Sequence, residues 1–325
     1  MAGTSAAVGA AATTGTPAAG GSPAAESTGR AAPGTAWHGG RTDWIGYVFV
    51  AFFAIPFVLF NIMPILFGIY VGFTDWSIIG TPNWVGLANF ERALADEWVW
   101  GAFANTLIYA SMIVPGVTVL ALAFALFVNQ GWPLSGLART LFFAPNVVSA
   151  TVIGLIWVWI LDTQFGIVNQ YLGDVGIDPV PWLTNVTWSK IGVSIASIWW
   201  DLGLAFILFL AALQGVPSEL YEAAEVDGAS RWQRFWHVTL PQIRPTLSMV
   251  VTLQLISTMR IFSQVYVMTN GGPAGSSASV IHYIYRTAIS RYEMGYASAI
   301  SMLLFVLILV VTLLQRFLLR ERGHG

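Results

Sequence analysis

Charged side chains are concentrated in one stretch of this apolar sequence, residues 214–245, called here the polar loop. It lies between two long apolar runs and holds four of the 16 acidic and three of the 14 basic residues. Two adjacent alanines let another surface approach the backbone, a glycine permits a positive φ, and the acids present charge to a partner. The sequence therefore predicts a docking surface made of Glu222, Ala223, Ala224, Asp227, Gly228, Leu240 and Pro241.

Helix start and stop signals divide the polar loop into two short helices. Pro217–Ser218 predicts a helix start, with the serine hydroxyl free to cap the first amides. Gly228 is expected to end this helix. Ser230 followed three residues later by Gln233 predicts a capping box at the start of the second helix, which Leu240–Pro241 is expected to close. An ordinary amphipathic loop at a membrane surface would show similar signals, so composition and short capped helices alone leave both interpretations open.

Polar side chains inside two apolar runs are the second group that could do chemistry. Asp201 lies near the middle of the run Ile191–Leu213, where an ionisable side chain costs about 2.5–3.5 kcal/mol on insertion scales. It is therefore expected to face a cavity or a partner. Ser194, Ser197 and Asp201 are spaced i, i+3 and i+7, which predicts one helix face.

The run Thr246–Met268 carries a matching polar stripe. Helical periodicity predicts a stripe roughly 120° wide, made of Gln254, Ser257, Thr258 and Gln264. Arg260 lies at its margin. Two interpretations remain open: these faces line a substrate path, or they form interhelical hydrogen bonds and an Asp201–Arg260 pair that only hold the helices together.

The composition indicates what positions these residues. The chain has 325 residues, of which 56% are hydrophobic and 9% charged, with a mean hydropathy of +0.69. Too few charges are present to cover a soluble globule of this size, so the sequence predicts a polytopic, all-α membrane protein. A formal net charge of −2 gives no support for nucleic-acid binding. Because cysteine is absent and the four histidines are scattered, no metal site is expected.

Six apolar runs are long enough to cross a bilayer, which takes about 20 helical residues. We place them near Trp44–Phe73, Phe103–Val128, Thr140–Leu161, Ile191–Leu213, Thr246–Met268 and Tyr296–Leu318. Residues 1–40 have almost no charge and no large apolar residue before Trp37, which predicts a disordered cytoplasmic tail ahead of a transmembrane domain, residues 41–325.

Basic residues indicate the orientation. With both termini in the cytoplasm, the arginines on the inner side are Arg41, Arg139, Arg231, Arg234, Arg244, Arg316, Arg320 and Arg322, and the basic residues outside are Arg92, Lys190, Arg286 and Arg291. This twofold excess favours an arrangement in which the polar loop faces the cytoplasm.

Signatures of catalysis are missing from the sequence. No GxxxxGK[ST] motif occurs, and the single lysine, Lys190, lies on the predicted outer side. Neither GxSxG nor HExxH is found. We therefore expect no enzymatic activity and no cofactor in this chain, and any energy from ATP must come from another subunit.

The string YEAAEVDGASRWQRFWHVTLPQIRPT, residues 221–246, resembles the cytoplasmic signature loop of binding-protein-dependent ABC importer permeases. Within that family it is similar to the carbohydrate branch, the maltose-type and glycerol-phosphate-type permeases. The resemblance extends over Trp44–Leu318 and includes FTDW at 73–76, WVGLANF at 84–90, RTLFFAPNVVS at 139–149 and GGPAGSS at 271–277. Ser263 departs from the pattern, because many such permeases carry Asp there.

The resemblance implies a type I importer permease with six transmembrane helices in the cell membrane. Its expected partners are a pair of ABC ATPase subunits that receive the polar loop as a coupling loop, a second permease of the same family, and an extracytoplasmic solute-binding protein. The expected solute is a mono- or oligosaccharide or a glycerol-phosphate-like compound. The two helices that flank the loop would contact it through Ser197, Trp200, Asp201, Gln254, Ser257 and Thr258.

Other transport functions remain as alternatives. An ABC permease for amino acids, peptides or phosphate would share the loop. A secondary transporter or channel would also need intramembrane polar residues, but it is expected to show internal repeats or broken helices rather than a large docking loop.

Overall fold

The computed structural model describes residues 43–131 and 135–319, and these form helices joined by turns and loops, with no β-strand among them. The chain divides into two compact units, Met1–Pro56 and Phe57–Gly325. The predicted disordered tail, residues 1–40, lies outside the described residues. The described part of the first unit belongs to α1 (Asp43–Phe57).

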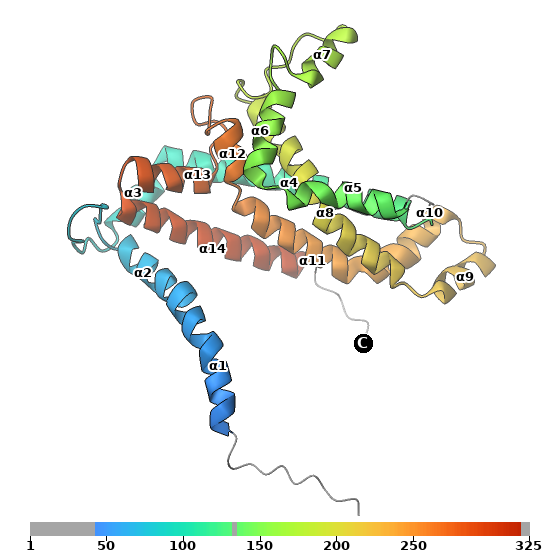
Figure 1. The fold of residues 1–325 in the computed structure, drawn as a ribbon, viewed down its shortest axis with the longest axis horizontal. Helices are drawn as coiled ribbons and strands as arrows, with labels where there is room; N and C mark the ends of the chain where they lie inside the picture. Colours follow the sequence, from blue (N-terminus) through green and yellow to red (C-terminus); the bar gives the residue numbers. More distant parts are fainter. Residues whose placement is uncertain (1–42, 132–134, 320–325) are drawn as a thin grey trace, which may run out of the picture. The chain divides into compact units, whose positions relative to one another are not determined.

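The second unit contains the remaining helices (Figure 1). Those before residue 132 are the π-turn η1 (Val58–Ile62), α2 (Met63–Gly72), α3 (Ala88–Ala95) and α4 (Glu97–Val128). Those up to the polar loop are α5 (Ser135–Val147), α6 (Ala150–Ile160), α7 (Ile167–Asp174) and α8 (Trp188–Gln214). Then follow α9 (Ser218–Val226), α10 (Arg231–Arg234), the π-turn η2 (Phe235–Thr239), α11 (Leu240–Met259), α12 (Ser263–Met268), α13 (Val280–Tyr285), the π-turn η3 (Arg286–Ser290) and α14 (Met294–Leu319).

Four helical stretches of the described chain are long and apolar enough to cross a membrane, namely Gly46–Gly72, Glu97–Val128, Trp188–Gln214 and Met294–Leu318. They correspond to four of the six predicted spans. A fifth is obtained if the pair Gly136–Val147 and Ala150–Ile160, which is bent by 101°, counts as one broken span. The structure therefore gives four or five apolar helices by length and composition, rather than the six predicted.

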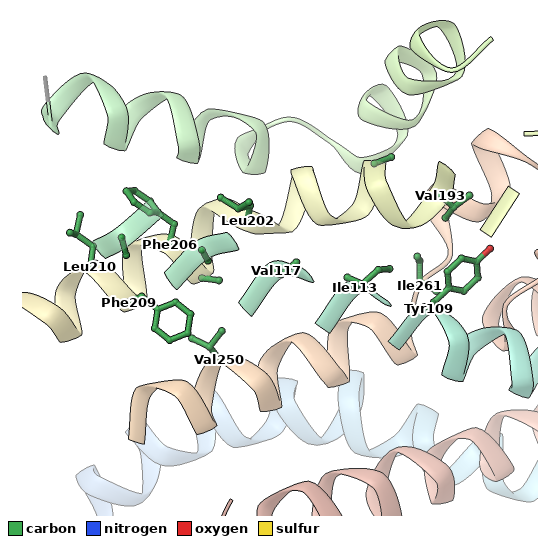
Figure 2. Packing of buried hydrophobic residues seen from close by; sticks show 14 of the residues in the cluster. Tyr109, Ile113, Val117, Val193, Leu202, Phe206, Phe209, Leu210, Val250 and Ile261 are labelled. Carbon is green, nitrogen blue, oxygen red and sulfur yellow. The ribbon is translucent and has the colours of Figure 1, made fainter. Parts of the chain in front are cut away.

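The largest apolar core lies between α4, α8 and α11, with α5 against α8. Figure 2 shows Phe209 from α8 beside Val250 from α11, and Phe206 on the other side of α8, where its ring contacts Phe142 of α5; Phe206, Phe209 and Val250 are all at most 1% exposed. Gly203 allows α8 to approach α5, because a Cβ there would lie 2.8 Å from the carbonyl oxygen of Phe142. The packing of these helices is thus set by a backbone-to-backbone contact as well as by apolar side chains.

A second core joins α14 to α13, α3 and the start of α4. The opposite face of α14 remains exposed, with large apolar side chains such as Phe305, Leu313 and Phe317. In water such a face would be unfavourable, whereas lipid or a further apolar subunit would cover it without cost. The distribution of apolar side chains therefore fits a membrane-embedded bundle.

Two of the predicted spans are interrupted. The run Thr140–Leu161 breaks between α5 and α6 at Val148 and Ser149, and the run Thr246–Met268 breaks between α11 and α12 at residues 260–262. Both were predicted as single helices because their composition stays apolar across the break. α12 has only six residues, and α11, with 20 residues, contains too many polar side chains, so neither counts among the helices that are long and apolar enough to cross a membrane.

Side-chain hydrogen bonds satisfy backbone groups that the breaks release. The Trp200 indole N–H donates to the Val148 carbonyl at 2.9 Å, and the Ser149 hydroxyl accepts from the Val152 amide at the start of α6. At the other break, the Ser279 hydroxyl donates to the Ile261 carbonyl at 2.6 Å. Non-helical backbone at membrane depth is tolerated only where such partners or a water-filled cavity are present.

Replacing Gly203 by Ala should destabilise the protein, because the new Cβ meets the backbone of Phe142 and Phe143 and forces α5 away from α8. We expect a loss of about 1–3 kcal/mol, measured as a lower thermal unfolding midpoint in detergent. Gly101→Ala in α4 is the matched control, because nothing lies within 4 Å of a Cβ there. Equal midpoints for the two variants would contradict the close contact between α5 and α8.

Candidate functional site

A cavity of about 410 Å³ lies where both broken helices meet α8. Its wall comes from α4, α6, α8, α11, α12 and the linker between the last two helices. The lining residues are Ile113, Ala150, Ser197, Trp200, Asp201, Leu253, Ile256, Ser257, Thr258, Arg260, Ile261, Phe262, Ser263 and Gln264. The α11–α12 break brings residues of both helices and of their linker to this site, whereas the α5–α6 pair contributes only Ala150 of α6.

Most of the predicted substrate-path residues line this cavity. Ser197, Trp200 and Asp201 enter it from α8, and Ser257 and Thr258 enter it from α11. Polarity and helical spacing predicted one face on each helix, and in the structure both faces contribute to the wall of the same cavity. Their role as substrate contacts stays a prediction.

Gln254 does not line the cavity. Its side chain is buried, with 6% exposed, and its Oε1 has no hydrogen-bond partner among the described residues. Periodicity placed Gln254 on the same stripe as Ser257 and Thr258, but only those two residues near the end of α11 reach the cavity, and the Gln254 side chain is buried away from it. Ser194 likewise lies outside the lining, and its hydroxyl is directed to the sulfur of Met112 at 3.7 Å.

The linker after α11 contributes residues that helical periodicity could not assign. Phe262 and Ser263 line the cavity only because the helix is interrupted at Arg260. Gln264 also reaches it, from the first turn of α12 rather than from a continuous stripe. The Gly271–Gly272 pair that follows was the only nearby signal of irregular backbone, and it lies beyond the break.

Asp201 and Arg260 share the cavity but do not pair. The ion pairs found in the described chain are Arg92–Glu293 and Arg234–Glu225. The interpretation in which an Asp201–Arg260 pair only holds the helices together is therefore not supported by the geometry. No hydrogen bond to the Asp201 carboxylate is found among the described residues either.

Arg260 lies at the end of α11. It is the C-cap of this helix, where the helix dipole favours a positive charge by about 0.3–1 kcal/mol. Its side chain is exposed on the cavity wall.

Neutral polar groups and an aromatic ring complete the wall. The Ser197 hydroxyl donates to the Val193 carbonyl at 2.8 Å, and the buried Thr258 hydroxyl has no partner among the described residues. Trp200 is half-buried beside them and has its N–H engaged by Val148, which leaves its ring for apolar contact. Hydroxyls, a carboxylate, a guanidinium and a ring suit a polyhydroxylated solute.

Side chains that could ligate a metal ion do not cluster in the described chain. No group of three or more histidine, aspartate or glutamate side chains is close enough to hold a metal ion within residues 43–131 and 135–319. The cavity itself holds one carboxyl group and no histidine.

The polar loop has the predicted glycine elbow. Gly228 follows α9 with φ at +76°, a conformation that strains side-chain-bearing residues. The capping box is present, because the Gln233 amide donates to the Ser230 hydroxyl at 3.3 Å and the Ser230 amide donates to the Gln233 side chain at 2.8 Å. The prediction that Ser218 caps α9 is wrong: Pro217 is the N-cap, and Ser218 is already inside the helix.

Leu240–Pro241 does not end a helix. The chain continues from α10 through the π-turn η2 directly into α11, which begins at Leu240. Pro241 lies in the first turn of α11, where a missing N–H is tolerated. A wider π-turn before it accommodates the proline without a stop.

The two halves of the polar loop are joined by side chains. The Tyr221 and Thr239 hydroxyls are 3.0 Å apart, and Arg234 forms an ion pair with Glu225 at 3.0 Å. Figure 1 shows α9 and α10 at the C-terminal end of α8 and the N-terminal end of α11. Since α11 has 20 residues, it connects the loop to the cavity over about 30 Å.

A polar cluster lies at the start of α4. The Asp96 carboxylate accepts hydrogen bonds from the Tyr296 hydroxyl at 2.7 Å and the Tyr283 hydroxyl at 2.9 Å. Burial raises the pKa of Asp96, but the two hydroxyls and the amides of the first turn outweigh it, so the pKa lies below its usual value. Asp96 is thus an ionised N-cap that ties α4 to α13 and α14.

Residues 93–323 match the family described as "Binding-protein-dependent transport system inner membrane component". The chain belongs to this family. The match covers more than half of the chain and includes both the cavity and the polar loop.

Relatives of known designation agree with this membership. The trehalose/maltose transport system permease protein MalF of Thermococcus litoralis is 32% identical over 277 residues, which cover 84% of this chain and 92% of that protein. The sulfoquinovosyl glycerol transport system permease protein SmoG of Agrobacterium fabrum is 29% identical over 271 residues, which cover 83% of this chain and 88% of that protein.

A solved structure shares the fold. It is a bacterial ABC transporter involved in the import of the acidic polysaccharide alginate, with 26% identity and a TM-score of 0.75, covering 86% of this chain and 96% of that one. The permease described here therefore has the type I ABC permease fold. The family and the fold indicate a transport subunit.

Two substitutions separate a cavity contact from a packing contact. Asp201→Asn should lower transport per assembled complex by about tenfold, because a charged hydrogen-bond acceptor is lost from the cavity wall. Gln254→Leu should leave that rate unchanged and raise the unfolding midpoint, because it removes a buried oxygen without a partner. Uptake normalised to purified complex tests both; a loss of transport in Gln254→Leu with unchanged stability would return Gln254 to the substrate path.

Proposed function

We propose that this chain is a permease subunit of an ATP-driven ABC importer and forms the translocation path for a saccharide or a glycerol-phosphate-like solute. The observation that carries the proposal is one continuous element, η2 with α11, that begins in a glycine-elbow loop and ends in the wall of a polar cavity. Relatives named for trehalose and maltose, sulfoquinovosyl glycerol and alginate support a carbohydrate as the solute.

The proposed topology has six spans in the cell membrane and both termini in the cytoplasm. Broken α5–α6 counts as the third span and broken α11–α12 as the fifth. Residues 41–325 then form the transmembrane domain, and the polar loop, residues 214–245, is its cytoplasmic coupling loop. The arginines of the loop support this orientation.

The proposed partners are a pair of ABC ATPase subunits, a second permease and an extracytoplasmic binding protein. A relative of this fold has been solved in complex with an alginate pentasaccharide-bound periplasmic protein, at 26% identity and a TM-score of 0.74, covering 86% of this chain and 94% of that one. Exposed Ser257 and Arg260 on the cavity wall are suited to face a second permease across the path.

Coupling would be mechanical. Glu222 and Asp227 are exposed on α9 and its C-cap, where they can meet the ATPase surface. A displacement of α9 passes to η2 through the Tyr221–Thr239 and Glu225–Arg234 contacts, and α11 then carries it to the cavity. Rigid helices that rock between two arrangements give alternating access without any chemistry in this subunit.

Broken helices do not distinguish this permease from a secondary transporter. They were expected to favour the latter, yet they are present here together with the polar loop. The family membership and the loop favour the ATP-driven importer.

Gly228→Pro should abolish uptake while the protein still inserts into the membrane. Proline cannot adopt the positive φ of the elbow, and it has no N–H to donate to the Glu225 carbonyl, as the Gly228 amide does. Gly176→Pro is a matched control outside the polar loop. The φ of Gly176 is +79°, no atom lies within 4 Å of a Cβ there, and the Gly176 amide donates to the Gly173 carbonyl.

Glu222→Lys should likewise prevent co-purification of the ATPase. Normal ATP-driven uptake by Gly228→Pro or Glu222→Lys in reconstituted complexes would exclude the docking role.

Two single-cysteine variants of this cysteine-free chain test the topology. Val226 on α9 is 89% exposed and Val175 after α7 is 70% exposed, so Val226→Cys and Val175→Cys create accessible thiols by the same substitution. A membrane-impermeant maleimide should label Val226→Cys only from the cytoplasm and Val175→Cys only from outside. Labelling of both from one side would overturn the six-span arrangement.

A further inference from the structure

Arg260 is a cation in the cavity with no anionic partner in the described chain. It stands at the point where α11 ends, and its guanidinium takes part in no ion pair or hydrogen bond among the described residues. Asp201 lies in the same wall but is not within ion-pair distance. The two charges are therefore free to engage different parts of one ligand.

The groups around Arg260 lack a negative charge of their own. Its neighbours in the sequence and in the lining are Thr258, Phe262, Ser263 and Gln264, which are neutral. The buried Thr258 hydroxyl has no hydrogen-bond partner within residues 43–131 and 135–319. This corner of the cavity therefore offers several donors and one fixed positive charge, which suits an anionic acceptor.

A guanidinium binds different sugar groups with different strength. Its five N–H donors match two oxygens of a carboxylate or sulfonate in a bidentate arrangement, and charge-assisted bonds of this kind are about twice as strong as neutral ones. The hydroxyls of a neutral sugar can accept hydrogen bonds from it, but they leave its positive charge without a counter-charge. An oxyanion satisfies both the donors and the charge.

We propose that Arg260 binds an oxyanion group of the transported saccharide, so that this permease carries acidic rather than neutral sugars. The proposal rests on the carbohydrate function proposed above and specifies its substrate class. On α8, the Asp201 carboxylate and the Ser197 hydroxyl oxygen, whose hydrogen is donated to the Val193 carbonyl, would accept hydrogen bonds from the ligand's hydroxyls. The relatives are named for neutral and for acidic compounds alike, so Arg260, not the resemblance, carries the choice.

Equilibrium binding to the purified complex with its partner subunits tests the proposal. The probes are a radiolabelled mannuronate trisaccharide, its carboxyl-reduced neutral counterpart, and a sulfonated glycoside that separates sulfonate from carboxylate recognition. Arg260→Gln should weaken binding of at least one acidic probe about 10- to 100-fold and leave the neutral probe within about twofold. Arg260→Lys should recover part of the affinity, since it keeps the charge but not the bidentate geometry.

Ser263→Asp provides a second variant that keeps Arg260 in place. A carboxylate on the same wall should compensate the positive charge of the Arg260 guanidinium. Binding of the acidic probes should then be weakened as in Arg260→Gln. Arg316→Gln on α14, an exposed arginine outside the cavity, should change no affinity.

The outcomes separate this inference from the proposed function. Equal binding of acidic and neutral probes in both the wild type and Arg260→Gln would overturn the acidic class and leave a sugar permease in place. Loss of the permease pair in Arg260→Gln, with unchanged affinity in the complexes that remain, would instead assign Arg260 as a counter-ion for the second subunit. Binding of none of the sugars, with uptake of an amino acid or peptide, would overturn the carbohydrate function as well.

Discussion

The rest of this structure depends on one constraint: backbone amides and carbonyls released by a helix break must find partners, because lipid offers none. At the α5–α6 break, the Trp200 indole N–H donates to the Val148 carbonyl and the Ser149 hydroxyl caps α6. At the α11–α12 break, the Ser279 hydroxyl donates to the Ile261 carbonyl. These bonds make interrupted spans tolerable. The interruptions in turn open the cavity, since its wall includes Ala150 beside one break and residues 260–264 at the other.

The same element that contains one break also reaches the polar loop. A continuous helix from α10 through η2 to α11 means that a shift at the loop cannot be absorbed by a flexible hinge before the cavity. Pro241 would stop a helix in many settings, but here it lies in the first turn of α11 after a π-turn. The Leu240–Pro241 pair, which predicted a helix end, thus lies inside a continuous helical segment.

Several features could be predicted because they depend on neighbours in the sequence. The capping box at Ser230 and Gln233 and the positive φ of Gly228 follow from local backbone chemistry, and both are present. The face shared by Ser197 and Asp201 follows from helical periodicity, which holds along the unbroken α8. Periodicity failed for Gln254, because the part of the stripe that meets the cavity depends on how α11 packs against its neighbours.

The sequence by itself determined the class of protein, the approximate positions of four apolar helices, the two-helix loop and the family resemblance, since each depends on composition or on short-range spacing. Only the tertiary structure decided where the spans break, which polar residues meet, and that Asp201 and Arg260 share a cavity without pairing. The physical reason is that a break is stable only if distant groups complete its hydrogen bonds. Trp200 is 52 residues from Val148, and Ser279 is 18 residues from Ile261, so no local pattern could contain both partners.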